Sequence, residues 1–69
     1  MSPAERPPAP DISRLVHDLA NPLSAVLAEV QLLLLDADAL PPDAVTSLRA
    51  IETAALKMRE MLKSAARRA

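Results

Sequence analysis

The chain has 69 residues and a formal net charge of -1, and 51% of it is hydrophobic although it contains no Phe, Trp, Tyr, Cys or Gly. A chain of this length forms at most one small domain, and its core must consist of Leu, Ile, Val, Ala and Met, so we expect an all-α protein. The lack of cysteine excludes disulfides and zinc fingers, a single histidine excludes a nitrogen-ligated metal site, and the lack of glycine excludes a glycine-rich phosphate loop. No metal and no cofactor are therefore expected in this chain.

The charge pattern also restricts the partners. Acidic and basic residues are interspersed and aromatic residues are absent, so we expect no nucleic-acid surface. The longest apolar run, Val30 to Leu35, contains Gln31 and is too short to span a bilayer, and no apolar segment follows a basic start. These features predict a cytoplasmic protein with no membrane segment.

Prolines divide the chain. Residues 1–10, MSPAERPPAP, hold four of the seven prolines and are predicted to be a disordered lead-in, while residues 11–69 form the domain. Asp11 is a good N-cap for a first helix over about 11–38, and the segment from Leu40 to Asp43, LPPD, opens a second helix over about 42–67. The short connection forces the two helices to run antiparallel, each roughly 40 Å long, as a helical hairpin.

Both predicted helices carry a broad apolar stripe with alternating steps of four and three residues, as in a helical bundle. In the first helix the stripe consists of Ile12, Val16, Leu19, Leu23, Val26, Val30, Leu33 and Ala37, flanked by Leu15, Leu27 and Leu34. In the second it consists of Ala44, Leu48, Ile51, Ala55, Met58, Leu62 and Ala65, broadened by Val45, Ala54 and Met61. Two helices cannot cover stripes of this width, so we expect a homodimer in which two hairpins form a four-helix bundle.

The stretch HDLANPL, residues 17 to 23, departs from a simple bundle helix. At about 100° per residue, His17 and Asn21 lie one turn apart on the face away from the stripe, among small residues. Pro22 has no N–H for the carbonyl of Asp18 and is expected to bend the helix one turn after His17. An interior proline costs on the order of 3 kcal/mol, which packing or function must offset.

This stretch resembles the H-box of the dimerisation and histidine-phosphotransfer domain of bacterial sensor histidine kinases. In that family a His is followed by Glu or Asp, two variable residues, Asn or Thr, and Pro, on the first helix of a hairpin that dimerises into a four-helix bundle. The resemblance covers about residues 11 to 67 and implies a phosphoacceptor of two-component signalling in the bacterial cytoplasm.

The resemblance also implies roles for four residues. His17 would accept the γ-phosphoryl group of ATP and pass it to an aspartate of a response regulator, which is reasonable because imidazole offers a neutral nucleophilic nitrogen near pH 7. Asp18 would hydrogen-bond the imidazole and act as general base, although neighbouring helical residues normally diverge. Asn21 would contact nucleotide or orient a hydrolytic water, and Pro22 would supply the bend that admits partner domains.

A complete kinase of this family continues into an ATP-binding domain with glycine-containing motifs, and those motifs are missing here. Mg-ATP would therefore act only through a separate catalytic domain, in cis or in trans, so whether the chain counts as an enzyme stays open. It could be an excised domain or a free-standing one, and Met1 with the proline-rich start favours a natural N-terminus. The expected partners are a second copy, a receiver domain and a kinase ATP-binding domain. The alternative is a non-catalytic dimeric scaffold that binds a kinase or a regulator.

Overall fold

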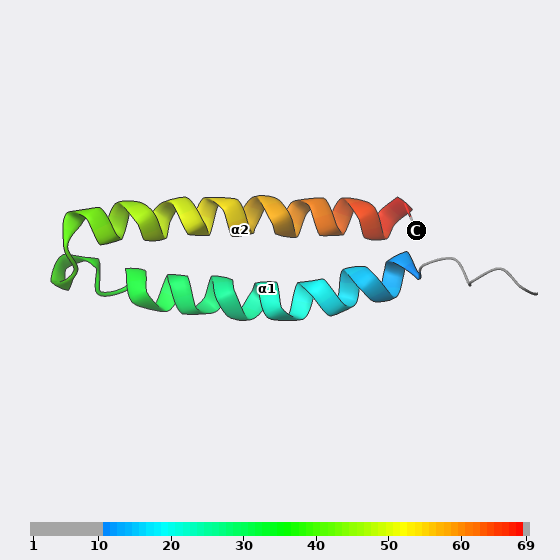
Figure 1. Cartoon of the computed structure of the whole chain (residues 1–69), viewed down its shortest axis with the longest axis horizontal. Coiled ribbons are helices and arrows are strands. Elements are labelled where there is room, and N and C mark those ends of the chain that lie inside the picture. The colour runs from blue at the N-terminus through cyan, green and yellow to red at the C-terminus, as the bar shows by residue number, and fades with distance from the viewer. Residues whose placement is uncertain (1–10, 69) are drawn as a thin grey trace, which may run out of the picture.

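The protein folds as an antiparallel helical hairpin. The structure is a computed structural model that describes residues 11–68. Helix α1 spans Ile12–Leu34, a short 3-10 helix, η2, spans Ala37–Ala39, and helix α2 spans Pro42–Arg68. The two long helices lie side by side and the chain reverses at the η2 end (Figure 1). The predicted all-α hairpin is therefore confirmed, while the predicted lead-in, residues 1–10, lies outside the described residues.

Helix α1 begins where the sequence predicts. Asp11 has extended backbone angles, and its carboxylate Oδ1 accepts a hydrogen bond from the backbone N–H of Arg14 at 3.1 Å. This bond satisfies one of the N–H groups that a helix leaves free at its first turn. Asp11 is thus the N-cap of α1.

Helix α1 ends at Leu34, before the predicted end near residue 38. The N–H of Leu35 is shared between the carbonyls of Gln31 and Leu32, and the N–H of Asp36 bonds to the carbonyl of Leu33, so the last turn tightens to three-residue spacing. Asp36 then leaves the helical region with φ -113° and ψ 40°. Aspartate favours turns over helix interiors, which explains why η2 replaces the last predicted turn.

Two prolines start α2 as predicted. Leu40, which precedes Pro41, is extended with φ -100° and ψ 149°, because a residue before proline avoids the helical region. The carbonyl of Pro41 accepts the N–H of Val45, and Pro42 occupies the first helical position, where its missing N–H costs nothing. Asp43 in the first turn and Arg67 and Arg68 in the last turn complement the helix dipole.

Pro22 lies inside α1, which continues through it without interruption. Figure 1 shows α1 as a bowed helix beside a straighter α2. A smooth curve of this kind lets a helix keep its other hydrogen bonds around a proline. The proline is therefore accommodated by curvature and not by a break.

The hairpin has a very small core. Leu27 and Val30 of α1 and Ala55 of α2 are its buried hydrophobic residues, with exposed fractions of 5%, 6% and 3%. Leu27 was expected only on the flank of the stripe, whereas Leu19, Val26 and Leu33, expected at its centre, remain close to half exposed. A small residue such as Ala55 lets two helices approach closely, and the burial of Leu27 indicates that α1 is rotated so that this flank of its stripe faces α2. The other half of each apolar stripe remains open.

Candidate functional site

The four residues of the predicted site lie on consecutive turns of α1 and are all exposed. His17 and Asn21 are one turn apart on the same side of the helix. Among the described residues, no side-chain hydrogen bond holds either of them. Nothing in the hairpin thus blocks an incoming group from the imidazole of His17.

Asp18 contacts a residue that the sequence reasoning did not include in the site. The Oδ2 of Asp18 lies 4.0 Å from the Nε of Arg14, and the two side chains are 63% and 80% exposed. An ion pair this exposed contributes little and exchanges easily. No hydrogen bond joins Asp18 to His17 in the described chain, so the general-base role remains a prediction. The four-residue spacing of Arg14 and Asp18 could have revealed this pair.

An open apolar groove runs between α1 and α2 along one side of the hairpin. Its volume is about 460 Å³, and it is lined by Leu19, Pro22, Leu23 and Val26 of α1 and by Ile51, Ala54, Ala55, Met58, Met61 and Leu62 of α2. Leu19, Ile51 and Met58 are each 45–53% exposed there, and Met61 is 62% exposed. Apolar side chains gathered in this way on an exposed side of a hairpin are typical of a contact surface.

The apolar groove and His17 lie on opposite sides of α1. His17 and Val26 are nine residues apart, which at about 100° per residue places them roughly 180° from each other around the helix. A partner that covers Val26 therefore leaves His17 accessible. Pro22 belongs to both regions, because it follows Asn21 and also lines the apolar groove.

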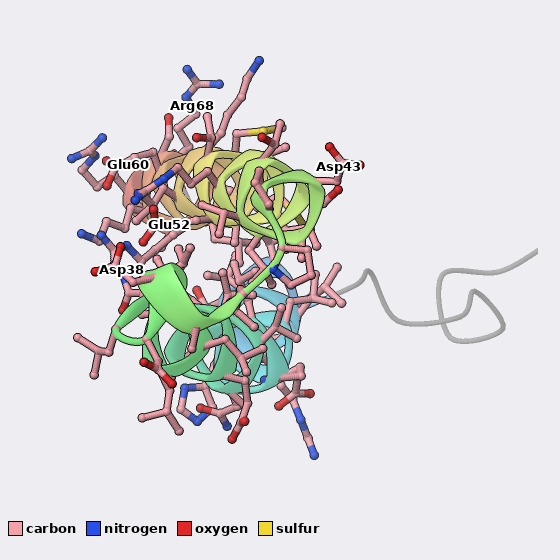
Figure 2. The ribbon with its side chains drawn as sticks, turned by 90° about the vertical axis from the view of Figure 1, so that its left-hand side faces the viewer. Asp38, Asp43, Glu52, Glu60 and Arg68 are labelled. Carbon is pink, nitrogen blue, oxygen red and sulfur yellow. The ribbon has the colours of Figure 1, made fainter. Side chains whose placement is uncertain are left out.

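A second, smaller groove lies on the other side of the hairpin, which we call the basic groove. Its volume is about 270 Å³, and it is lined by Val16, Ala20, Leu23 and Ser24 of α1 and by Arg59, Leu62, Lys63 and Ala66 of α2. Figure 2 looks along the hairpin and separates the two sides, because Asp43 projects on one side of α2 while Glu52 and Glu60 project on the other. Helical periodicity places Met61 on the side of Asp43 and Lys63 on the side of Glu52. The sequence reasoning did not assign Arg59 or Lys63 to the site.

Two further properties concern residues 11–68. Neither α1 nor α2 combines the length and the apolar character that crossing a membrane requires. No cluster of three or more His, Cys, Asp or Glu side chains in this part of the chain could hold a metal ion.

Comparisons with protein families, curated proteins and solved structures yield no match to this chain. The site must therefore be interpreted from its own residues and geometry.

Proposed function

We propose that this chain is a homodimeric histidine phosphoacceptor module of cytoplasmic two-component signalling in bacteria. His17 receives a phosphoryl group from a kinase ATP-binding domain or from a phosphorylated receiver domain, and passes it to an aspartate of a response regulator. The observation that carries the proposal is that, within the HDLANP motif, His17 and Asn21 are exposed on the side of α1 opposite the apolar groove.

The chemistry needs few groups. A neutral imidazole nitrogen of His17 attacks the γ-phosphorus of ATP, the new N–P bond forms as the P–O bond to ADP breaks, and ADP leaves. Asp18 accepts a hydrogen bond from the other imidazole nitrogen after its side chain leaves the ion pair with Arg14. That ion pair is exposed and therefore holds Asp18 only weakly. Asn21, one turn from His17, positions nucleotide or a hydrolytic water.

A second copy of the chain is the occupant proposed for the apolar groove. Both helices contribute to the groove, α1 with four residues and α2 with six, so a two-fold axis along it would pair each half with its equivalent in the other hairpin. The result is a four-helix bundle in which Leu19, Val26, Ile51 and Met58 become core residues. The small core of one hairpin, centred on Leu27 and Ala55, supports the need for this second layer.

The outer face of α1 remains free in such a dimer and extends from Asn21 toward η2. Leu32 and Leu35 lie on this face and are 61% and 84% exposed. Apolar side chains on the same face of α1 as His17, about four to five turns from it, fit a surface on which a receiver domain docks while its aspartate reaches the imidazole.

The test is intact-mass spectrometry of the full chain after incubation with ATP, alone or with a histidine-kinase ATP-binding domain, and with phosphorylated receiver domains. We expect one acid-labile phosphoryl group only when a protein donor is present, and none in His17→Gln. Thr53→Ala, an exposed position of α2 that lines neither groove, serves as the control and is expected to be phosphorylated like the wild type.

Failure of every donor to phosphorylate a folded dimer would refute the phosphoacceptor role. The apolar groove would then favour the alternative, a dimeric scaffold that binds a kinase or a regulator without carrying phosphate.

A further inference from the structure

The His17 end of the hairpin differs in charge from the η2 end. Residues 11–23 and 57–68, which form the His17 end, contain six cationic side chains and three carboxylates. Residues 24–56, which form the η2 end, contain five carboxylates and one cation. Although the net charge of the whole chain is only -1, positive charge is concentrated at the end of the hairpin that carries His17 and negative charge at the η2 end.

Two of these cations lie beside the α1 turns that carry His17. Arg59 and Lys63 line the basic groove across from Val16, Ala20 and Ser24. Val16 precedes His17 in sequence, while Ala20 and Ser24 follow it on the next turns toward the same side of the helix. The groove therefore adjoins the turn of His17. Its surface is mostly apolar, so the aliphatic stems of Arg59 and Lys63 form its α2 wall while their charged ends stay exposed.

The charges of Arg59 and Lys63 are available to a ligand. Lys63 pairs with Glu60 at 3.6 Å, but these two side chains are 59% and 65% exposed, so the pair is weak. Within residues 11–68 no carboxylate forms an ion pair with Arg59. Glu52 shares this side of α2, as Figure 2 shows, but it lies two turns from Arg59 in the direction of η2. Glu60 also lies on this side and pairs with Lys63, so an anion at His17 would compete with Glu60 for Lys63 and would meet Arg59 without such competition.

We propose that Arg59 and Lys63 form a phosphoryl-holding subsite that positions and neutralises the phosphoryl group at His17, with their side chains reaching it from α2 across the basic groove. The inference rests on the proposed phosphoacceptor function. A phosphoryl group bears up to two negative charges, and Arg and Lys side chains bind such oxygens through charge-assisted hydrogen bonds. Neutralising this charge speeds attack by an uncharged imidazole and prolongs the life of the product. Both residues act as positioning residues and not as nucleophiles.

A small donor tests the subsite without any partner protein. Phosphoramidate transfers its phosphoryl group when the imidazole nitrogen of His17 bonds to phosphorus, the P–N bond of the donor breaks, and ammonia leaves. The measurement follows formation and decay of phosphohistidine by intact mass and phosphorus NMR, at low ionic strength and at 1 M salt. The variants are Arg59→Gln/Lys63→Gln and the charge-matched control Arg49→Gln/Lys57→Gln, whose two exposed cations do not line the basic groove.

We expect the groove variant to form phosphohistidine about tenfold more slowly than the wild type, and the control variant to differ less than about twofold. Because exposed charges are screened, the difference between the two variants should shrink at 1 M salt. Arg59→Lys/Lys63→Arg keeps both charges and should restore most of the rate, which a purely structural role would not predict.

Equal rates for the groove and control variants in folded protein would overturn the subsite while leaving the phosphoacceptor function intact. A wild type that reacts no faster than His17→Gln would overturn the phosphoacceptor function and, with it, the subsite. The helical circular dichroism signal of each variant shows that it is folded.

Discussion

Replacing Met61 by Glu should weaken dimerisation strongly, whereas the same change at Leu32 should not. The two side chains are almost equally exposed in one hairpin, 62% for Met61 and 61% for Leu32, so the single chain predicts equal effects. Only Met61 lines the apolar groove. The pair of variants therefore isolates the contribution of the groove.

The magnitude follows from the exposed area. Full burial of a methionine contributes about 1.5–3 kcal/mol, so burying the exposed 62% of Met61 contributes about 1–2 kcal/mol in each protomer. A two-fold dimer buries both copies, which gives about 2–4 kcal/mol, and a buried carboxylate adds a desolvation cost. We expect the dimer dissociation constant of Met61→Glu to rise by at least 30-fold, since about 1.4 kcal/mol corresponds to a factor of ten.

Sedimentation equilibrium over a range of micromolar concentrations measures this constant, with circular dichroism recorded on the same samples. Leu32→Glu should dimerise like the wild type. Equal dissociation constants for the two variants, or a wild type that is a folded monomer at every concentration, would refute the proposed bundle.

Three further predictions concern α1. Leu27→Ala should lower the free energy of unfolding by about 2–5 kcal/mol, because removal of this buried side chain leaves a cavity, while the exposed Leu35→Ala should change it by less than about 0.5 kcal/mol. Urea titrations of both variants at one protein concentration measure this difference, and equal midpoints would contradict it. Pro22→Ala should raise the free energy of unfolding by up to about 3 kcal/mol, because it restores a backbone hydrogen bond inside α1, and it should slow phosphoryl uptake. A urea midpoint below that of the wild type would contradict the cost assigned to Pro22. Asp11→Ala should cost about 1 kcal/mol and Asp11→Asn much less, as thermal unfolding would show; equal losses would argue against the cap.

Local chemistry made the helix boundaries predictable. Asp11 caps α1, and the pair Pro41 and Pro42 starts α2, because capping and the fixed φ of proline act within a few residues. The predicted end of α1 near residue 38 was wrong. Asp36 and Asp38 have low helix propensity, and the pattern of apolar residues used for the prediction takes no account of it. Boundaries set by strong local signals were thus read correctly, and the weaker one was not.

The exposure of His17 and Asn21 was also predictable, because helical periodicity fixes which residues share a side of α1. The contact between Arg14 and Asp18 lies within the same helix and follows from the same rule. The chemical roles of these residues do not follow from periodicity, and they remain predictions for the phosphorylation experiments.

By itself the sequence determined two amphipathic helices, their antiparallel order and the outward side of the histidine motif. Only the tertiary structure decided which half of each apolar stripe is buried, with Leu27 against α2 and Val26 left in the open groove. It also decided that Arg59 and Lys63 lie beside the turns around His17. The physical reason is that periodicity fixes angles around one helix, whereas the rotation and register of two helices depend on how closely small side chains such as Ala55 let them pack.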